Sequence, residues 1–177
     1  MHLNVNSLQN KKEEVERLIH QFKAQVIFLT ETKIDASYPN SQFAINNLNI
    51  YRNDGVKGGG GVTSYFSSAL PSKKLKIPGN YKTIEPLAIQ SSFGRKHVIV
   101  LGLYRSPKVV GKDYYLRLEE ELNNICSWAF LQKQSTIIMG DLNLNRLRPD
   151  QREGKILHDL EEVHRLHCLM REPTRVT

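Results

Sequence analysis

Polar side chains follow four apolar, strand-like segments of this sequence, close to the point where each segment ends. They are Asn4 and Asn6 after the first segment, Glu31 after the second, Tyr104 and Arg105 after the third, and Asp141 and Asn143 after the fourth. Asn and Asp are depleted inside strands, so their repeated appearance at strand ends needs a cause. Carboxylate and amide oxygens suit Mg2+, which binds few protein ligands because it keeps several waters. The pattern therefore predicts a magnesium site that can hold a phosphate.

An ordinary turn is the alternative for each of these residues. Gly140-Asp141 or Glu31-Thr32 alone is more typical of a turn than of a site, because Asp, Asn and Gly dominate turns. Four strand ends that all carry such groups favour one shared site. The surrounding strands and helices must then bring the four ends together.

Short apolar runs rich in β-branched residues mark the strands that carry these side chains. We expect strands at 3–5, 26–29, 62–66, 87–93, 98–104 and 136–139. The run at 136–139 reads as a buried strand. A turn at 94–96 joins two of the strands, and the glycines at 58–61 interrupt the chain before another.

Three amphipathic helices are expected between the strands. The first places Val15, Leu18, Ile19 and Phe22 on one face. The second covers about 115–129, with Asp113 near its N-cap. The third covers about 154–165 and points Ile156, Leu157, Leu160 and Val163 inward. Strands and helices in this mixture predict a layered α/β or α+β domain.

The chain is basic, with 25 Lys and Arg against 18 Asp and Glu among 177 residues, and a pI of about 9.4. Such a charge attracts polyanions, most commonly nucleic acid, although a merely basic surface fits it equally well. No apolar run reaches the roughly 18 residues of a membrane span. No secretory signal is visible, and the two cysteines lack CxxC spacing, so we expect a reduced, intracellular protein with no membrane partner.

Four segments resemble, in order and spacing, the successive motifs of the endonuclease/exonuclease/phosphatase superfamily. They are Asn-Val-Asn-Ser-Leu at 4–8, Phe-Leu-Thr-Glu-Thr-Lys at 28–33, Gly-Leu-Tyr-Arg-Ser-Pro at 102–107 and Gly-Asp-Leu-Asn at 140–143. Three features resemble the endonuclease domains of non-LTR, LINE-like retrotransposons in particular. They are the Tyr-Arg-Ser-Pro form, the glycine run at 58–61 and Glu-Pro-Thr-Arg-Val-Thr at 172–177. The resemblance spans essentially the whole chain.

The resemblance implies a DNase I-like fold, a four-layered α/β/β/α sandwich with the motifs at one rim. It implies that Glu31 holds Mg2+ (or Mn2+) and that Asn4 helps to place the ion. Asp141 is then the group that orients or deprotonates the attacking water, and Asn143 steadies the site and the phosphate. These roles agree with metal-assisted hydrolysis, in which a carboxylate positions the nucleophile.

Three further residues are candidates for contact with the substrate. By resemblance, Tyr104 contacts the scissile phosphate. Arg105 is a candidate for a backbone phosphate contact, since its planar fork suits phosphate geometry, and Asn6 is a second candidate. For Tyr104 and Arg105, a packing role is an open alternative.

The sequence departs from the family at its end. Members close their site with a Ser-Asp-His motif on a late strand, which in the retrotransposon relatives lies beyond the Pro-Thr-Arg segment. This sequence ends within that segment, so we expect one domain at 1–177 that lacks its last strands and has impaired activity. His158-Asp159 has the reversed order in a predicted helix that His164 and His167 follow, and none of these is expected to substitute.

Three functions stay open at this point. The first is a DNA-nicking endonuclease domain of a non-LTR retrotransposon, monomeric and nuclear, with a reverse transcriptase domain downstream. The second is another phosphodiesterase or phosphatase of the superfamily, acting on inositol phosphates, sphingomyelin or poly(A). The third is a catalytically impaired remnant that binds nucleic acid weakly through its charge.

Overall fold

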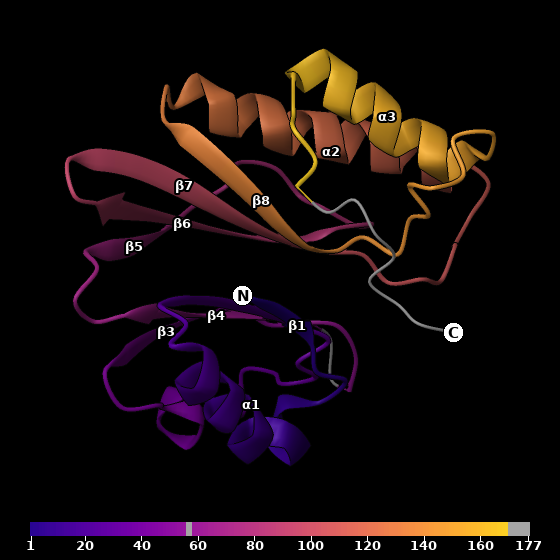
Figure 1. Ribbon diagram of the computed structural model, residues 1–177. Helices are drawn as coiled ribbons and strands as arrows, with labels where there is room; N and C mark the ends of the chain where they lie inside the picture. The colour runs from indigo at the N-terminus through magenta and orange to yellow at the C-terminus, as the bar shows by residue number, and fades with distance from the viewer. Residues whose placement is uncertain (56–57, 170–177) are drawn as a thin grey trace.

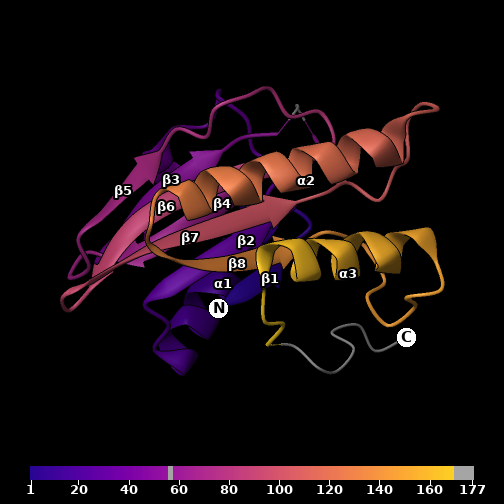
Figure 2. The ribbon, with the colours of Figure 1, turned by 90° about the horizontal axis from the view of Figure 1, so that it is seen from above.

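Two four-stranded β-sheets face each other, with helices on their outer faces (Figure 1). The computed structural model describes residues 1–55 and 58–169. Helix α1 (Leu8–Phe22) lies outside the first sheet, whereas α2 (Tyr114–Leu131) and α3 (Arg152–His164) lie side by side outside the second (Figure 2). The expected four-layered α/β/β/α sandwich is therefore confirmed.

The first sheet comes entirely from the N-terminal part of the chain. Its strands, in spatial order, are β1 (His2–Asn4), β2 (Val26–Thr30), β4 (Val62–Ser67) and β3 (Leu48–Asn53). Strands β1 and β2 are parallel and the other pairs are antiparallel. Helix α1 connects the parallel pair, as a parallel crossover requires. A short 3-10 helix, η1 (Asn40–Phe43), precedes β3.

The second sheet comes from the C-terminal part. Its strands, in spatial order, are β5 (Ser72–Leu75), β6 (Glu85–Phe93), β7 (Lys96–Tyr104) and β8 (Ser135–Asp141). Strands β7 and β8 are parallel, with α2 between them in the chain, and the other pairs are antiparallel. Each sheet thus ends in a parallel pair, and both pairs matter for the site.

Along the central strands, successive side chains point alternately toward the helices and toward the opposite sheet, so each strand contributes to two core layers. On β2, Ile27 and Leu29 pack against α1, while Phe28 points between the sheets. The Phe28 ring meets Phe66 edge to face at 6.0 Å between centroids. On β7, Leu101 packs against α2 in the same alternating way. Because successive side chains of a strand point to opposite faces, both strands are apolar throughout.

Two strands were not predicted, and one was predicted with the wrong burial. Strands β3 and β5 carry Asn, Arg, Lys and Ser, and they lie at sheet edges, where the apolar signal is weak. The expected buried strand at 136–139 is β8, and the prediction of burial is wrong, because Ile137 is 43% exposed. Strand β8 is an edge strand in the described sheet, so one side of it has no neighbour.

The three helices occur where they were expected, with smaller apolar faces. Phe22 and Val163 are 64% and 68% exposed, so the prediction that Val163 points inward is wrong. Both lie in the last turn of a helix. Asp113 is the N-cap of α2, but its side chain makes no capping hydrogen bond. No helix of residues 1–55 and 58–169 is long and apolar enough to cross a membrane. The segment at 172–177 lies outside the described residues.

Candidate active site

Four of the expected site residues stand at the carboxyl ends of the two parallel strand pairs. Asn4 ends β1 opposite Thr30 of β2, and Glu31 follows directly. Tyr104 ends β7 opposite Asp141, which ends β8. Because the carboxyl ends of parallel strands lie at one edge of a sheet, each pair presents its polar groups together. The stacking of the two sheets brings both pairs to the same rim.

Asn4 connects the two sheets at this rim. Its Nδ2 donates a hydrogen bond of 2.8 Å to Glu31 Oε1 and another of 2.9 Å to Asp141 Oδ2. Its Oδ1 accepts a hydrogen bond of 3.2 Å from the backbone N–H of Asn6. The amide therefore holds two carboxylates from different sheets side by side while its own orientation is fixed.

The backbone around these groups is held in unfavourable conformations. Asn6, Ser7, Glu31 and Lys33 all have positive φ, at 47°, 110°, 55° and 54°. Such conformations cost a non-glycine residue about 1–2 kcal/mol each, and they concentrate at functional sites. Hydrogen bonds between the two loops compensate: Ser7 N–H donates to Glu31 O at 2.8 Å, and Lys33 Nζ donates to Asn6 Oδ1 at 2.5 Å.

A glycine loop supports the turn that carries Glu31. The Lys33 N–H donates to Gly60 O at 2.9 Å, and the Gly61 N–H donates to Glu85 Oε2 at 2.5 Å. Gly60 has a φ of 64°, which strains most other residues, and a Cβ there would lie 2.1 Å from the Glu85 carboxylate and displace it, so glycine is favoured. Glu85 was not predicted as a site residue. Its one sequence signal is a charged residue at the start of an apolar strand.

Tyr104 lies beneath the rim with its ring in the core between the sheets. Burial raises the pKa of Tyr104 to about 12, with further contributions from Glu31, Glu85 and Asp141 and from a hydrogen bond to Glu31. The phenol is therefore neutral throughout the physiological range. It can serve as a hydrogen-bond donor at the rim, and it cannot serve as an anionic base there.

The loop after β8 is tightly organised. Asp141 Oδ1 accepts a hydrogen bond of 3.0 Å from the Asn143 N–H, and Asn143 has a φ of 49°. Gly140 has a φ of 144°, and a Cβ there would lie 1.9 Å from the backbone O of Leu103. The Asn143 side chain donates to Arg105 O at 2.7 Å. Asn143 thus ties the loop after β8 to the residue that follows β7.

Arg105 is placed differently from the expectation of an exposed phosphate contact. Its side chain is 1% exposed and points into the protein. Its Nη1 donates to the backbone oxygens of Leu142 and Asn143 at 3.1 and 2.9 Å, and its Nη2 donates to Glu153 Oε1 at 3.0 Å. The described conformation therefore does not offer the guanidinium to a bound phosphate, because the group is buried and both Nη atoms donate to backbone carbonyls or a carboxylate. Asn6, the other candidate, is exposed at the rim.

His164, one of the C-terminal histidines, packs between helices. It makes a 2.9 Å hydrogen bond with Asn123 Oδ1 of α2 and stacks on Phe130 at 5.6 Å between ring centroids. Burial lowers the pKa of His164. These contacts give His164 a packing role between α2 and α3.

The donors at the rim suit one hard cation. No group of three or more His, Cys, Asp and Glu that could hold a metal occurs among the described residues. Mg2+ needs no such cage, since it is usually bound by one or two carboxylates plus waters and substrate phosphate. Glu31 and Asp141 are both partly exposed and are bridged by one amide, so the residues fit that mode.

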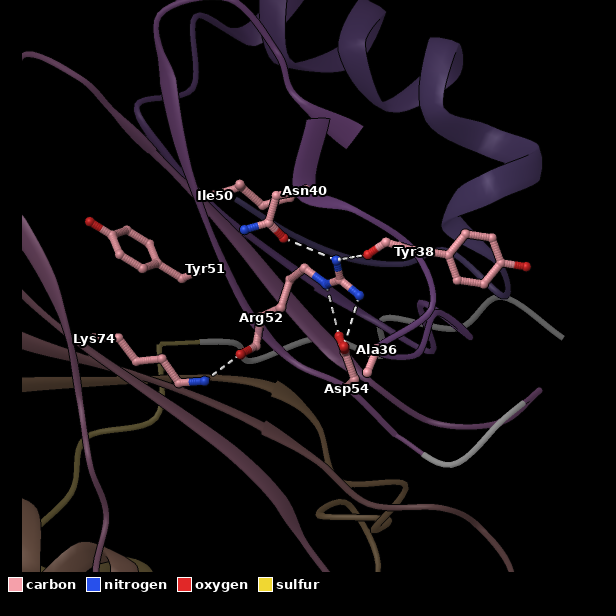
Figure 3. A pocket seen from close by; sticks show the side chains of 8 residues that line it. All are labelled: Ala36, Tyr38, Asn40, Ile50, Tyr51, Arg52, Asp54 and Lys74. Atoms are coloured by element: carbon pink, nitrogen blue, oxygen red, sulfur yellow. Dashed lines mark hydrogen bonds and ion pairs between the residues drawn. The ribbon is translucent and has the colours of Figure 1, made fainter. Parts of the chain in front are cut away.

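A hollow of about 480 Å³ lies elsewhere, beside β3 and η1 (Figure 3). Arg52 dominates it, and all five of its N–H donors are used. The acceptors are both oxygens of Asp54, the backbone oxygens of Asp35 and Tyr38, and Asn40 Oδ1. Because Arg52 has no free donor for an anion, the hollow is a weaker candidate than the rim for a phosphate-binding site.

Comparison with known proteins supports the fold. The model of the Endonuclease/Exonuclease/phosphatase family matches residues 1–169, and no curated protein sequence matches the chain. The AP endonuclease from Archaeoglobus fulgidus is similar at 15% identity and a TM-score of 0.63, over 92% of this chain and 69% of that one. AP endonuclease LMAP from Leishmania major is similar at 14% identity and a TM-score of 0.66, over 92% and 65%.

A third similar structure is the 3′ phosphatase NExo from Neisseria, bound to a product DNA hairpin. It is 14% identical with a TM-score of 0.60, over 90% of this chain and 69% of that one. At these identities the likeness concerns the fold. The chain spans about two thirds of the length of the structures that it matches.

Proposed function

Because the chain belongs to the Endonuclease/Exonuclease/phosphatase family, we propose that it hydrolyses phosphodiester bonds of DNA with a divalent metal ion. We further propose that the ion is Mg2+ and that the reaction is the nicking of DNA by the endonuclease domain of a non-LTR retrotransposon. The observation that carries this proposal is the Asn4 amide, which holds Glu31 and Asp141 together at the rim.

Each rim residue has a role that its contacts support. Asp141 accepts hydrogen bonds on both oxygens, from Asn4 and from the Asn143 N–H, so its carboxylate is fixed in direction. A carboxylate so oriented can align a water molecule and take its proton as the water attacks phosphorus. Tyr104 stays protonated and can donate to a phosphoryl oxygen, where charge builds in the transition state.

Glu31 would hold the metal ion, with Asn4 fixing its separation from Asp141. When bound, the ion supplies positive charge that polarises the phosphoryl group and offsets the charge on the leaving oxygen. The left-handed backbone of Glu31 and its support by the glycine loop would keep this carboxylate in place before substrate arrives. Such preorganisation matters because a misplaced group loses much of its effect on rate.

DNA is the substrate that charge and similarity favour. The net charge of +7 suits a polyanion, and the similar NExo structure holds a DNA hairpin. The Tyr-Arg-Ser-Pro form at 104–107 and the segment 172–177 resemble retrotransposon endonucleases. We accordingly propose a monomeric domain over 1–177 that acts in the nucleus and is encoded beside a reverse transcriptase. A reverse transcriptase reading frame next to the gene would support this, and its absence would refute it.

Nicking of supercoiled plasmid tests the activity. We expect conversion to the open-circular form with Mg2+, no conversion with EDTA, and recovery when Mg2+ is restored. Asp141→Asn and Glu31→Gln should each lower the rate by about 10²–10⁴-fold, since each removes one acid, base or electrostatic partner. Glu14→Ala, on the exposed face of α1, is the matched control for loss of a carboxylate.

Parallel substrates separate the alternatives within the family. Single-stranded RNA and soluble inositol phosphates are incubated under the same conditions. Faster turnover of either substrate than of DNA, with the same dependence on Asp141, would favour another phosphodiesterase or phosphatase activity of the family over DNA nicking. Plasmid binding without any metal-dependent cleavage would instead indicate a protein that only binds nucleic acid.

A further inference from the structure

Arg105 is one of the largest fully buried side chains in the protein. Burying a charged group costs several kcal/mol, and well-packed hydrophobic residues in its place are often no less stable. Arg105 also satisfies its donors poorly, because its Nε has no hydrogen-bond partner among the described residues. Core packing therefore gives no sufficient reason for an arginine at this position.

The contacts of Arg105 cover the whole loop that carries Asp141. The backbone N–H of Arg105 donates to the backbone O of Asp141 at 2.9 Å, and the backbone O of Arg105 accepts from Asn143 Nδ2 at 2.7 Å. Its guanidinium donates to the backbone oxygens of Leu142 and Asn143. One residue thus makes four hydrogen bonds to three consecutive residues, including the carboxylate-bearing one.

The other side of the guanidinium is anchored to the helix layer. Its Nη2 donates to Glu153 Oε1 in the first turn of α3, and the Tyr115 hydroxyl donates to the same oxygen at 3.0 Å. The Tyr114 ring of α2 lies 5.6 Å from the guanidinium carbon, within range of a cation–π interaction. Both helices therefore hold the Arg105 guanidinium in position while it donates to the loop at 141–143.

We propose that Arg105 is a positioning residue that locks the Asp141–Asn143 loop to the helix layer, so that Asp141 faces Glu31 across Asn4. The inference rests on the proposed function for its catalytic consequence, but the locking itself is a property of the chain. A guanidinium is needed because its planar fork reaches two carbonyl groups and a carboxylate at once. Lysine keeps the charge and lacks the fork.

The test compares Arg105→Lys with Arg52→Lys. Both replace a multiply bonded arginine with a residue of the same charge, and the partly buried Arg52 lies in the hollow beside β3 and η1. Hydrogen–deuterium exchange is measured for 140–145, for 35–40 and, as an internal reference, for β4. Steady-state cleavage of a DNA oligonucleotide gives kcat and KM for the same preparations.

We expect Arg105→Lys to speed exchange in 140–145 by at least about tenfold, with 35–40 and β4 unchanged. Its kcat should fall by about 10–100-fold at a similar KM, since a shifted carboxylate affects the transition state rather than binding. Arg52→Lys should speed exchange in 35–40 and leave kcat as it was. This split distinguishes positioning from a general loss of stability.

Two results would overturn the proposal. One is unchanged exchange in 140–145 for folded Arg105→Lys. The other is a raised KM at constant kcat with a smaller salt dependence of binding, which would indicate a direct phosphate contact.

If Arg105→Lys does not fold, the same exchange measurement is made on Glu153→Ala. This change removes the carboxylate that accepts from Arg105 Nη2, at a partly exposed position. Unchanged exchange in 140–145 of that variant would equally refute the lock. If the wild-type chain cleaves nothing, the proposed function fails while the exchange data still judge the lock.

Discussion

The side-chain amide of Asn4 donates to Glu31 in one sheet and to Asp141 in the other, and these two bonds join carboxylates that lie 110 positions apart in the sequence. Two carboxylates at one rim repel each other, and a donor shared between them offsets that repulsion. The amide therefore sets the spacing between the proposed metal ligand, Glu31, and the proposed base, Asp141.

Asn4→Asp should remove this bridge while keeping the shape of the side chain. A third carboxylate has no proton to donate at neutral pH and adds like charge, so we expect cleavage to fall by about 10²-fold or more. Stability should fall by about 1 kcal/mol, because the bonds are exposed and well screened. Urea unfolding and plasmid nicking measure the two effects. Asn10→Asp, on the exposed face of α1, is the control, and equal effects of both changes would contradict the bridge.

Much of the rim could be predicted from the sequence because strand ends are local signals. Apolar runs ending in Asn4, Glu31, Tyr104 and Asp141 locate four side chains, and parallel pairing brings their strand ends to one edge. The role of Arg105 could not be predicted. Its position after Tyr104 suggests an exposed cation, whereas its burial depends on carbonyl groups near position 142 and on Glu153. Long-range partners of this kind leave no local pattern.

Glu85 escaped prediction for a similar reason, and the edge strands for another. Glu85 receives its hydrogen bond from Gly61, 24 positions earlier, in a glycine run that the sequence marks only as an interruption. Strands β3 and β5 are edge strands whose few apolar side chains, among them Leu48, Ile50 and Leu75, are interspersed with Asn, Arg, Lys and Ser. A short edge strand of this composition gives only a weak apolar periodicity.

Glu85→Ala should loosen the turn that carries Glu31. It leaves the Gly61 N–H without its acceptor, which costs about 1–3 kcal/mol for a partly buried donor. It also removes a negative charge that raises the pKa of Tyr104, so that pKa should fall from about 12 toward its ordinary value of 10. Thermal unfolding and titration of tyrosine absorbance at 295 nm measure the two changes. Glu14→Ala is the control, and a Tyr104 titration unmoved by Glu85→Ala would contradict the contact.

The raised pKa of Tyr104 predicts how stability depends on alkaline pH. In the unfolded chain tyrosine loses its proton near pH 10, whereas the folded protein keeps that of Tyr104 until about pH 12. The contribution to stability is therefore fully present below pH 10 and is lost as pH rises toward 12. In Tyr104→Phe the fall in unfolding free energy over this range should be shallower. A wild-type slope in the variant would show that Tyr104 is not the group responsible.

Gly140→Ala should damage both fold and site, because its backbone conformation is strained for any other residue and its Cβ would strike the backbone of Leu103. We expect a loss of about 2–4 kcal/mol in unfolding free energy and reduced cleavage. Gly94→Ala is a matched control, since Gly94 also has a positive φ but has open space around its Cβ. That change should cost only about 1–2 kcal/mol. Similar losses for both variants, measured by urea unfolding, would rule out the close approach to Leu103.

Each sheet is built from one uninterrupted stretch of chain, 2–67 for the first and 72–141 for the second. Every strand pairing can therefore form before the two stretches meet, whereas the contact between Asn4 and Asp141 spans 137 positions. Contacts of such long range incur most of their loop-closure entropy before they stabilise anything. We expect the rim to be the slowest part of the molecule to form as it folds. A chain with both sheets formed but not yet docked would contain Asn4, Glu31, Tyr104 and Asp141 without an assembled active site. The rate at which cleavage recovers during refolding would therefore report the rate at which the two sheets dock.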